Sequence, residues 1–178
     1  MTALSRLFLP AHALLSRPVS DIAPGRLVLR MAHGGEKSAK LGIRFDFDDG
    51  RFVLPVLGQE NLDGHRAVEV TGNDERAYQV GLEFSLEADL EAPVRGWGVR
   101  DARAGELACG ASGCALIVGL HPLGRYPFNT PIRLSDWTKG MESELDTVFG
   151  GWRVRITIPQ SEPVYINPVR AAGPGAAA

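Results

Sequence analysis

Apolar and polar side chains alternate along most of the chain from Gly25 onward. In the segment 41–48 every second residue is Leu, Ile or Phe, and the segment 51–57 repeats this alternation after the turn sequence Asp48-Asp49-Gly50. Because a strand places successive side chains on opposite faces, a period of two predicts half-buried strands. We therefore expect the two segments to form an antiparallel hairpin.

The same period recurs in later segments. In 78–87 five apolar side chains occupy alternate positions, which predicts one continuous strand, because a helix would scatter them around its circumference. The segment 115–120 is apolar at nearly every position, which predicts a central strand covered on both faces. Further short strands are expected at 26–31, 66–71, 94–100, 152–158 and 163–166.

One segment departs from the period of two. Large apolar residues recur at helical spacing from Trp137 to Phe149, Ser135 or Asp136 could cap the first turn, and Gly150-Gly151 could end the last one. This spacing predicts an α-helix over 136–149, packed on a sheet through a single apolar stripe.

The pattern as a whole predicts an all-β, mainly antiparallel fold, a β-sandwich or partly closed barrel of about 8–10 strands with the one packed α-helix. We divide the chain into an apolar N-terminal arm (1–24), a single β-rich domain (25–167) and a tail rich in Pro, Gly and Ala (168–178). A chain of 178 residues is long enough for one domain with a sizeable core.

The N-terminal arm carries Leu4, Leu7, Phe8 and Leu9, which would be unfavourable on a solvated terminus. We expect them to contact the protein's own core, a partner protein or a membrane surface. Pro10 interrupts the apolar run, so the arm lacks the core of a secretory signal, and a cytoplasmic location is expected. No segment approaches the ~20 apolar residues of a membrane-spanning helix, although peripheral membrane contact stays open.

Charge and cysteine content narrow the function classes. The 19 basic and 21 acidic residues give a net charge of -2, which offers no broad positive field for nucleic acid. Cys109 and Cys114 enclose a flexible four-residue spacer. We favour two reduced, half-buried thiols over a hairpin disulfide, and both over metal or redox chemistry.

Motifs for catalysis or metal binding fail on their spacing. The run Asp46 to Gly50 begins like a calcium loop, but Arg51 and Leu57 occupy the positions that need glycine and a bidentate acid. The four histidines are scattered, and Ser112 lacks the glycine that completes a nucleophile elbow. The acidic residues of 83–91 are expected on a solvated strand face. We therefore predict no catalytic residue, no metal and no cofactor.

The loop 121–131 offers the most varied chemistry. Its three prolines would stiffen it, and its polar and aromatic side chains together with Trp97 make a candidate set for ligand or partner binding: Trp97, His121, Arg125, Tyr126 and Asn129. The alternative interpretation is an ordered loop that seals one end of the core. An enzyme would need His121 as a base beside an acid such as Asp136.

These observations favour a non-enzymatic protein–protein interaction module, an accessory or structural subunit of a larger assembly at the periphery of a membrane complex or in a virion or tail. The alternative hypothesis is a β-sandwich that binds carbohydrate or a small ligand through Trp97 and the loop 121–131.

Overall fold

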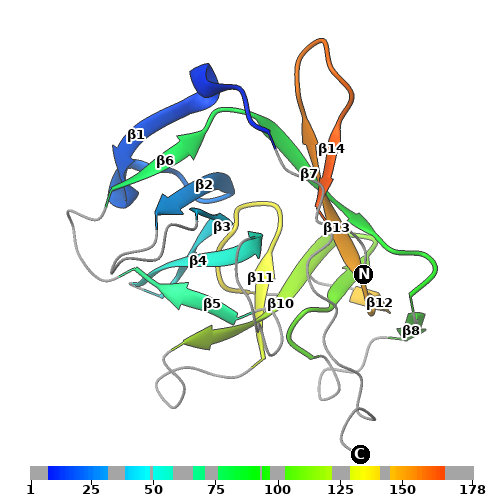
Figure 1. Ribbon diagram of the computed structural model, residues 1–178. Coiled ribbons are helices and arrows are strands. Elements are labelled where there is room, and N and C mark those ends of the chain that lie inside the picture. Colours follow the sequence, from blue (N-terminus) through cyan, green and yellow to red (C-terminus); the bar gives the residue numbers. More distant parts are fainter. Residues whose placement is uncertain are drawn as a thin grey trace, which may run out of the picture.

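The computed structural model describes residues 8–31, 39–48, 50–57, 66–70, 76–92, 94–96, 103–121, 129–140 and 145–166. Over these ranges the chain forms fourteen strands and two single-turn 3-10 helices, η1 (Ala11–Ala13) and η2 (Val19–Asp21) (Figure 1). The predicted all-β, mainly antiparallel fold is confirmed, and the described strands alone outnumber the 8–10 expected from the sequence.

Eleven strands form one large sheet. In spatial order they are β1 (Leu14–Pro18), β6 (Arg76–Val80), β2 (Arg26–Met31), β3 (Ala39–Phe47), β4 (Gly50–Leu57), β5 (Arg66–Glu69), β10 (Gly113–His121), β9 (Leu107–Gly110), β12 (Leu145–Phe149) and β8 (Val94–Gly96), with β11 (Thr130–Arg133) also paired to β10. Strand β10 pairs with β5, β9 and β11, which confirms its predicted central position. The β5–β10 pair is parallel, and the other pairings described are antiparallel.

The remaining three strands form a small sheet in the order β14 (Val164–Ile166), β13 (Trp152–Thr157) and β7 (Glu83–Ala88). The chain passes between the sheets three times, from β6 to β7 through Gly81, from β7 back to β8, and from β12 to β13 through Gly150-Gly151. Inward-facing residues of both sheets belong to one core cluster, which includes Phe45 and Phe52 of the large sheet and Val154 and Ile156 of the small one. The two sheets therefore enclose a common core.

The predicted hairpin at 41–57 is confirmed as β3 and β4. Phe47 pairs with Gly50 across the turn, where Asp48 adopts a left-handed φ of 48°. Phe45 lies opposite Phe52, and their rings stack with centroids 5.6 Å apart. Alternation thus directs the aromatic side chains of both strands into the core.

The predicted continuous strand at 78–87 is two strands. Its alternation holds on both sides of Gly81, but β6 belongs to the large sheet and β7 to the small one. The Gly81 N–H donates to the carbonyl of Ala13 at 2.7 Å, which ends the pairing of β6 with the N-terminal arm. The inward side chains of this run therefore line the common core from both sheets.

The predicted helix at 136–149 is wrong. Residues 134–140 form a turn with an isolated bridge between Ile132 and Lys139, and Leu145–Phe149 is strand β12. A bulge between Leu145 and Thr147 inserts one extra residue into β12. The buried positions of the strand are consequently Leu145 and Val148, a spacing of three that imitates one face of a helix.

The described part of the N-terminal arm packs on the protein itself. Strand β1 pairs antiparallel with β6, and the segment after it covers the outer face of the large sheet. There Val19 and Ile22, each 1% exposed, form a second apolar cluster with Val28, Val53 and other side chains. This second cluster holds the arm against β2 and β4.

Candidate functional site

Of the five ligand-binding candidates, only Asn129 has a described side chain. Trp97, Arg125 and Tyr126 lie outside the described residues, and so does the side chain of His121, the last residue of β10. The Asn129 Oδ1 accepts a hydrogen bond from the Ala104 N–H at 3.0 Å. Asn129 therefore ties the start of β11 to the loop before β9, which is a structural role.

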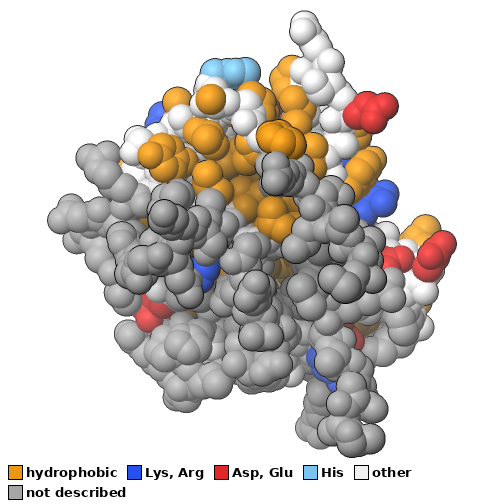
Figure 2. Space-filling view, viewed as in Figure 1, with side chains coloured by type: hydrophobic (Ala, Val, Ile, Leu, Met, Phe, Trp, Pro, Cys, Tyr) orange, Lys and Arg blue, Asp and Glu red, His pale blue; other side chains and the backbone are white. Residues whose placement is uncertain are grey.

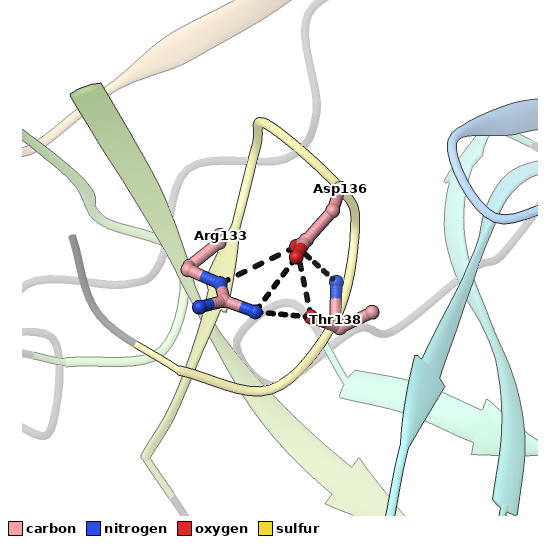
Figure 3. Close-up of polar contacts among 3 residues, drawn as sticks. All are labelled: Arg133, Asp136 and Thr138. Carbon is pink, nitrogen blue, oxygen red and sulfur yellow. Dashed lines mark hydrogen bonds and ion pairs between the residues drawn. The ribbon is translucent and has the colours of Figure 1, made fainter.

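A compact polar cluster forms on the turn after β11 (Figure 3). The Arg133 guanidinium donates to Asp136 Oδ2 at 2.7 Å and to Thr138 Oγ1 at 2.9 Å. The Thr138 N–H and hydroxyl both donate to Asp136 Oδ1, at 3.1 Å and 2.8 Å. Asp136 thus accepts a hydrogen bond from the N–H two residues later, which is the bond of an Asx turn. The side chain makes the contact expected of a helix N-cap, but here it stabilises a turn.

Trp137, between Asp136 and Thr138, and Lys139, directly after them, attach this turn to the rest of the fold. Trp137 has a left-handed φ of 58°, its carbonyl accepts from the Asp46 N–H at 3.1 Å, and its ring lies 5.7 Å from that of Phe84. The Lys139 ammonium lies 3.1 Å from the Asp48 carboxylate and over the ring of Phe47. The turn therefore seals one end of the core, the role that sequence analysis considered for the preceding loop.

The environment of Asp136 lowers its pKa. Partial desolvation by burial acts in the opposite direction, but the hydrogen bonds from Thr138 and the positive charge of Arg133 together outweigh it. Its carboxylate is thus occupied by Arg133 and Thr138 and favoured in the charged form. This arrangement is that of a structural acid, not of a carboxylate poised to orient His121.

We expect NMR titration to place the Asp136 pKa below its ordinary value of 3.8. Because the folded pKa is the lower one, the stabilisation from this group is present above the unfolded pKa and is lost as the pH falls through the folded value. Thr138→Val should raise the pKa by removing the hydroxyl donor. Thr147→Val, which removes a similar bond from Thr147 to Asp146, should leave it unchanged, and an equal response to both variants would contradict the assignment.

A buried cation lies on the outer face of β3. Arg44 is 4% exposed, and its guanidinium lies 2.8 Å from the Asp46 carboxylate, which is about one-third exposed. Its Nε is buried with no hydrogen-bond partner in the described structure. The Gly25 N–H donates to the Arg44 carbonyl at 2.7 Å, which joins the end of the arm to this strand.

The acidic residues of 83–91 are exposed or partly exposed, as predicted for a solvated face. The Glu87 carboxylate accepts from Arg153 at 2.8 Å across the small sheet, and Arg155 lies 3.8 Å from its other oxygen. Arg153 also lies over the ring of Tyr165, 4.2 Å from the ring centre. Glu87 is therefore neutralised by two arginines, unlike the paired free carboxylates of a glycosidase.

The N-terminal arm exposes apolar side chains. Phe8 is 75% exposed and Leu15 is 45% exposed, whereas Leu9 is half-buried against the core. Leu4 and Leu7, the other two predicted contacts of the arm, lie outside the described residues. Figure 2 shows hydrophobic side chains gathered over the upper part of the molecule, across β1 and β6 and toward β13 and β14.

The two cysteines form a disulfide, so the reduced thiols favoured from the sequence are a wrong prediction. Cys109 of β9 lies directly opposite Cys114 of β10, with their Cα atoms 4.1 Å apart. The sequence correctly indicated a tight turn between them, but it could not show that both side chains lie on the same face of one hairpin.

Within the described ranges, no three His, Cys, Asp or Glu side chains gather as a metal site requires, and no helix is long and apolar enough to span a bilayer. Comparison with protein-family models, with curated proteins and with solved structures finds no match to this chain.

Proposed function

We propose that this chain is a non-enzymatic protein–protein interaction module, an accessory subunit that binds an extended segment of another protein along the outer edge of β1. The observation that carries the proposal is the position of β1. It is one of the two terminal strands of the large sheet within the described structure, and it exposes Leu15, the second of its five residues. A free edge of this kind offers main-chain hydrogen bonds to a further strand.

The register shows which main-chain groups of β1 point outward. In an antiparallel pair, residues that exchange hydrogen bonds alternate with residues that do not. The bond from the Gly81 N–H to the Ala13 carbonyl sets this alternation, so Leu15 and Arg17 bond to β6. The N–H and carbonyl groups of Leu14 and Ser16 consequently face away from the sheet.

The side chains of β1 fit a short, specific contact. Leu15 lies between the two outward-facing residues and would contact a strand added beside it. Pro18 has no N–H and ends the available edge, which limits pairing to a few residues and protects against indefinite sheet growth. Such an edge supports recognition of one extended segment.

Carbohydrate binding, the alternative hypothesis from the sequence, has no observation in its favour among the described residues. Its two aromatic candidates lie outside them, and Asn129 is engaged with Ala104. The occupied carboxylates of Asp136 and Glu87 support a non-enzymatic role.

Two substitutions test the edge without disturbing β6. Ser16→Pro removes an outward-facing N–H, and Leu15→Lys replaces the exposed apolar side chain. We expect Ser16→Pro to weaken partner binding about tenfold or more, because one main-chain hydrogen bond contributes about 1 kcal/mol and the ring obstructs the added strand. The measurement is affinity capture from the native cells, followed by titration of the captured partner.

Leu90→Lys is the matched control, because Leu90 is 78% exposed but lies in the turn after β7. The control should retain the partner that both edge variants lose. If all three variants and the unaltered protein capture the same proteins with equal affinity, the β1 edge is not the interface. Light scattering on the purified protein shows separately whether a second copy is the partner.

A further inference from the structure

We propose that Cys109 and Cys114 form a reversible thiol–disulfide exchange site, which a dithiol reductant opens and a disulfide oxidant closes while the protein stays folded. This inference concerns a different part of the molecule from the β1 edge and does not depend on it. It rests on the register of the β9–β10 hairpin, the size of the ring that the bridge closes, and the exposure of the turn.

The hairpin backbone positions the two cysteines independently of the bridge. Gly110 pairs with Gly113 around a two-residue turn, and Ala108 pairs with Ala115 on the other side of the cysteines. The Ile117 N–H donates to the Glu106 carbonyl at 2.9 Å, and bonded and non-bonded pairs alternate along an antiparallel ladder. Counting from that bond, Cys109 and Cys114 are opposite residues that share no main-chain hydrogen bond. Such pairs bring opposite side chains closest together, so the sulfur atoms should remain neighbours after reduction.

The bridge adds little to the connections that already hold this hairpin. It spans a sequence separation of only 5 residues, and short rings restrict the unfolded chain less than long ones. Strand β10 is also paired to β5 and β11, and β9 to β12. These ladders do not involve the sulfur atoms, so the fold should survive reduction.

The site is accessible from the turn. Both cysteines are partly buried against the common core, whereas Ala111 and Ser112 in the turn beside them are exposed. We therefore expect a small dithiol to reach the bridge from the exposed turn. On the opposite face of the hairpin, Ala108 and Ala115 are fully buried in a separate small cluster with Leu145 and Val148, which holds the hairpin in place without the sulfur atoms.

A dithiol substrate supplies the two electrons and two protons that opening the bridge requires. A thiolate of the substrate attacks one cysteine sulfur, the disulfide bond breaks, and the other cysteine leaves as a thiolate that takes up a proton. The second substrate thiol then attacks the mixed disulfide and releases the first cysteine. The protein gains two electrons and two protons, and the substrate becomes a disulfide; the reverse reaction oxidises the protein.

The test uses the full-length protein under native conditions. We expect dithiothreitol to release both thiols together without denaturant, as measured by maleimide labelling and mass spectrometry. The far-UV circular dichroism should be unchanged, and Tm should fall by roughly 4–9 °C. Removal of the reductant in glutathione buffer should restore the intramolecular bridge. Labelling only in denaturant, loss of the folded spectrum on reduction, or fully labelled thiols before reduction would each overturn the proposal.

Two variants keep the test decisive. Cys109→Ser/Cys114→Ser should fold like the reduced protein and take up no label. Cys114→Ser leaves Cys109 alone and should form a mixed disulfide with oxidised glutathione in the folded state. If Cys109 stays unmodified in that folded variant, the sulfur is not accessible and the exchange site is excluded. If the double variant does not fold, the bridge is a structural requirement and the proposal fails.

Discussion

Replacement of Phe52 by alanine should lower the free energy of unfolding by about 3–5 kcal/mol, the usual cost of removing a fully buried aromatic side chain. Phe52 is 0% exposed and belongs to the common core. Its ring stacks on Phe45 and meets Phe47 edge-on, with centroids 6.0 Å apart. The strands around it belong to the longest ladder of the large sheet, so the structure has little freedom to close the cavity.

Urea unfolding followed by far-UV circular dichroism measures this effect, with Leu90→Ala as the control. Leu90 is 78% exposed, so its truncation should change the free energy of unfolding by no more than about 0.5 kcal/mol. Similar destabilisation by the two variants would show that Phe52 is not a core residue.

Gly25→Ala should destabilise the protein by about 2–4 kcal/mol, through backbone strain and overpacking together. Gly25 has a φ of +73°, which residues with a Cβ adopt at a cost. A Cβ there would also collide with the Trp137 ring, at 2.6 Å from its Nε1. We expect a displaced ring to weaken its contact with Phe84, which would loosen the turn that seals the core.

Gly96→Ala is the matched control for this prediction. A Cβ on Gly96 would meet no atom within 4 Å. Its replacement should therefore be neutral or slightly stabilising, since alanine loses less conformational entropy on folding than glycine. The same urea titration compares the two variants, and an equal loss of stability in both would argue against the packing of Trp137 on Gly25.

The strands that the sequence predicts well are those with a strict period of two. The hairpin of β3 and β4 follows from alternation and from a turn sequence that tolerates a left-handed Asp48. In β13 the same alternation buries Trp152, Val154 and Ile156. Here one local rule, opposite faces for successive residues, is sufficient because the common core takes the large side chains of one face, whether the other face contacts water, as in β13, or the N-terminal arm, as in the hairpin.

The helix prediction fails because a bulge changes the local period. One extra residue between Leu145 and Thr147 converts a spacing of two into a spacing of three, which sequence periodicity cannot distinguish from a helical face. Strands β9 and β8 pair with β12 on its two sides and set the register in which the bulge occurs. Those partners are distant in sequence, so the information is tertiary.

The features proposed to carry function depend on the same kind of information. The sequence identified the apolar arm and the cysteine pair, but β1 is a terminal strand of the described large sheet only because Leu14–Pro18 pairs with Arg76–Val80, more than fifty residues away. Likewise, Asn129 is a candidate ligand by residue type, yet Ala104 uses its side-chain oxygen.

Local patterning by itself determined the all-β class and the hairpin of β3 and β4, through alternation, and the central position of β10, through a continuous apolar run, because neighbouring residues encode both patterns. The tertiary structure decided where the run 76–88 changes sheets at Gly81, where β12 bulges, and that Cys109 faces Cys114. Each of these depends on which strands become neighbours. Long-range packing around a shared core makes that choice, and no local sequence pattern identifies the partner strand.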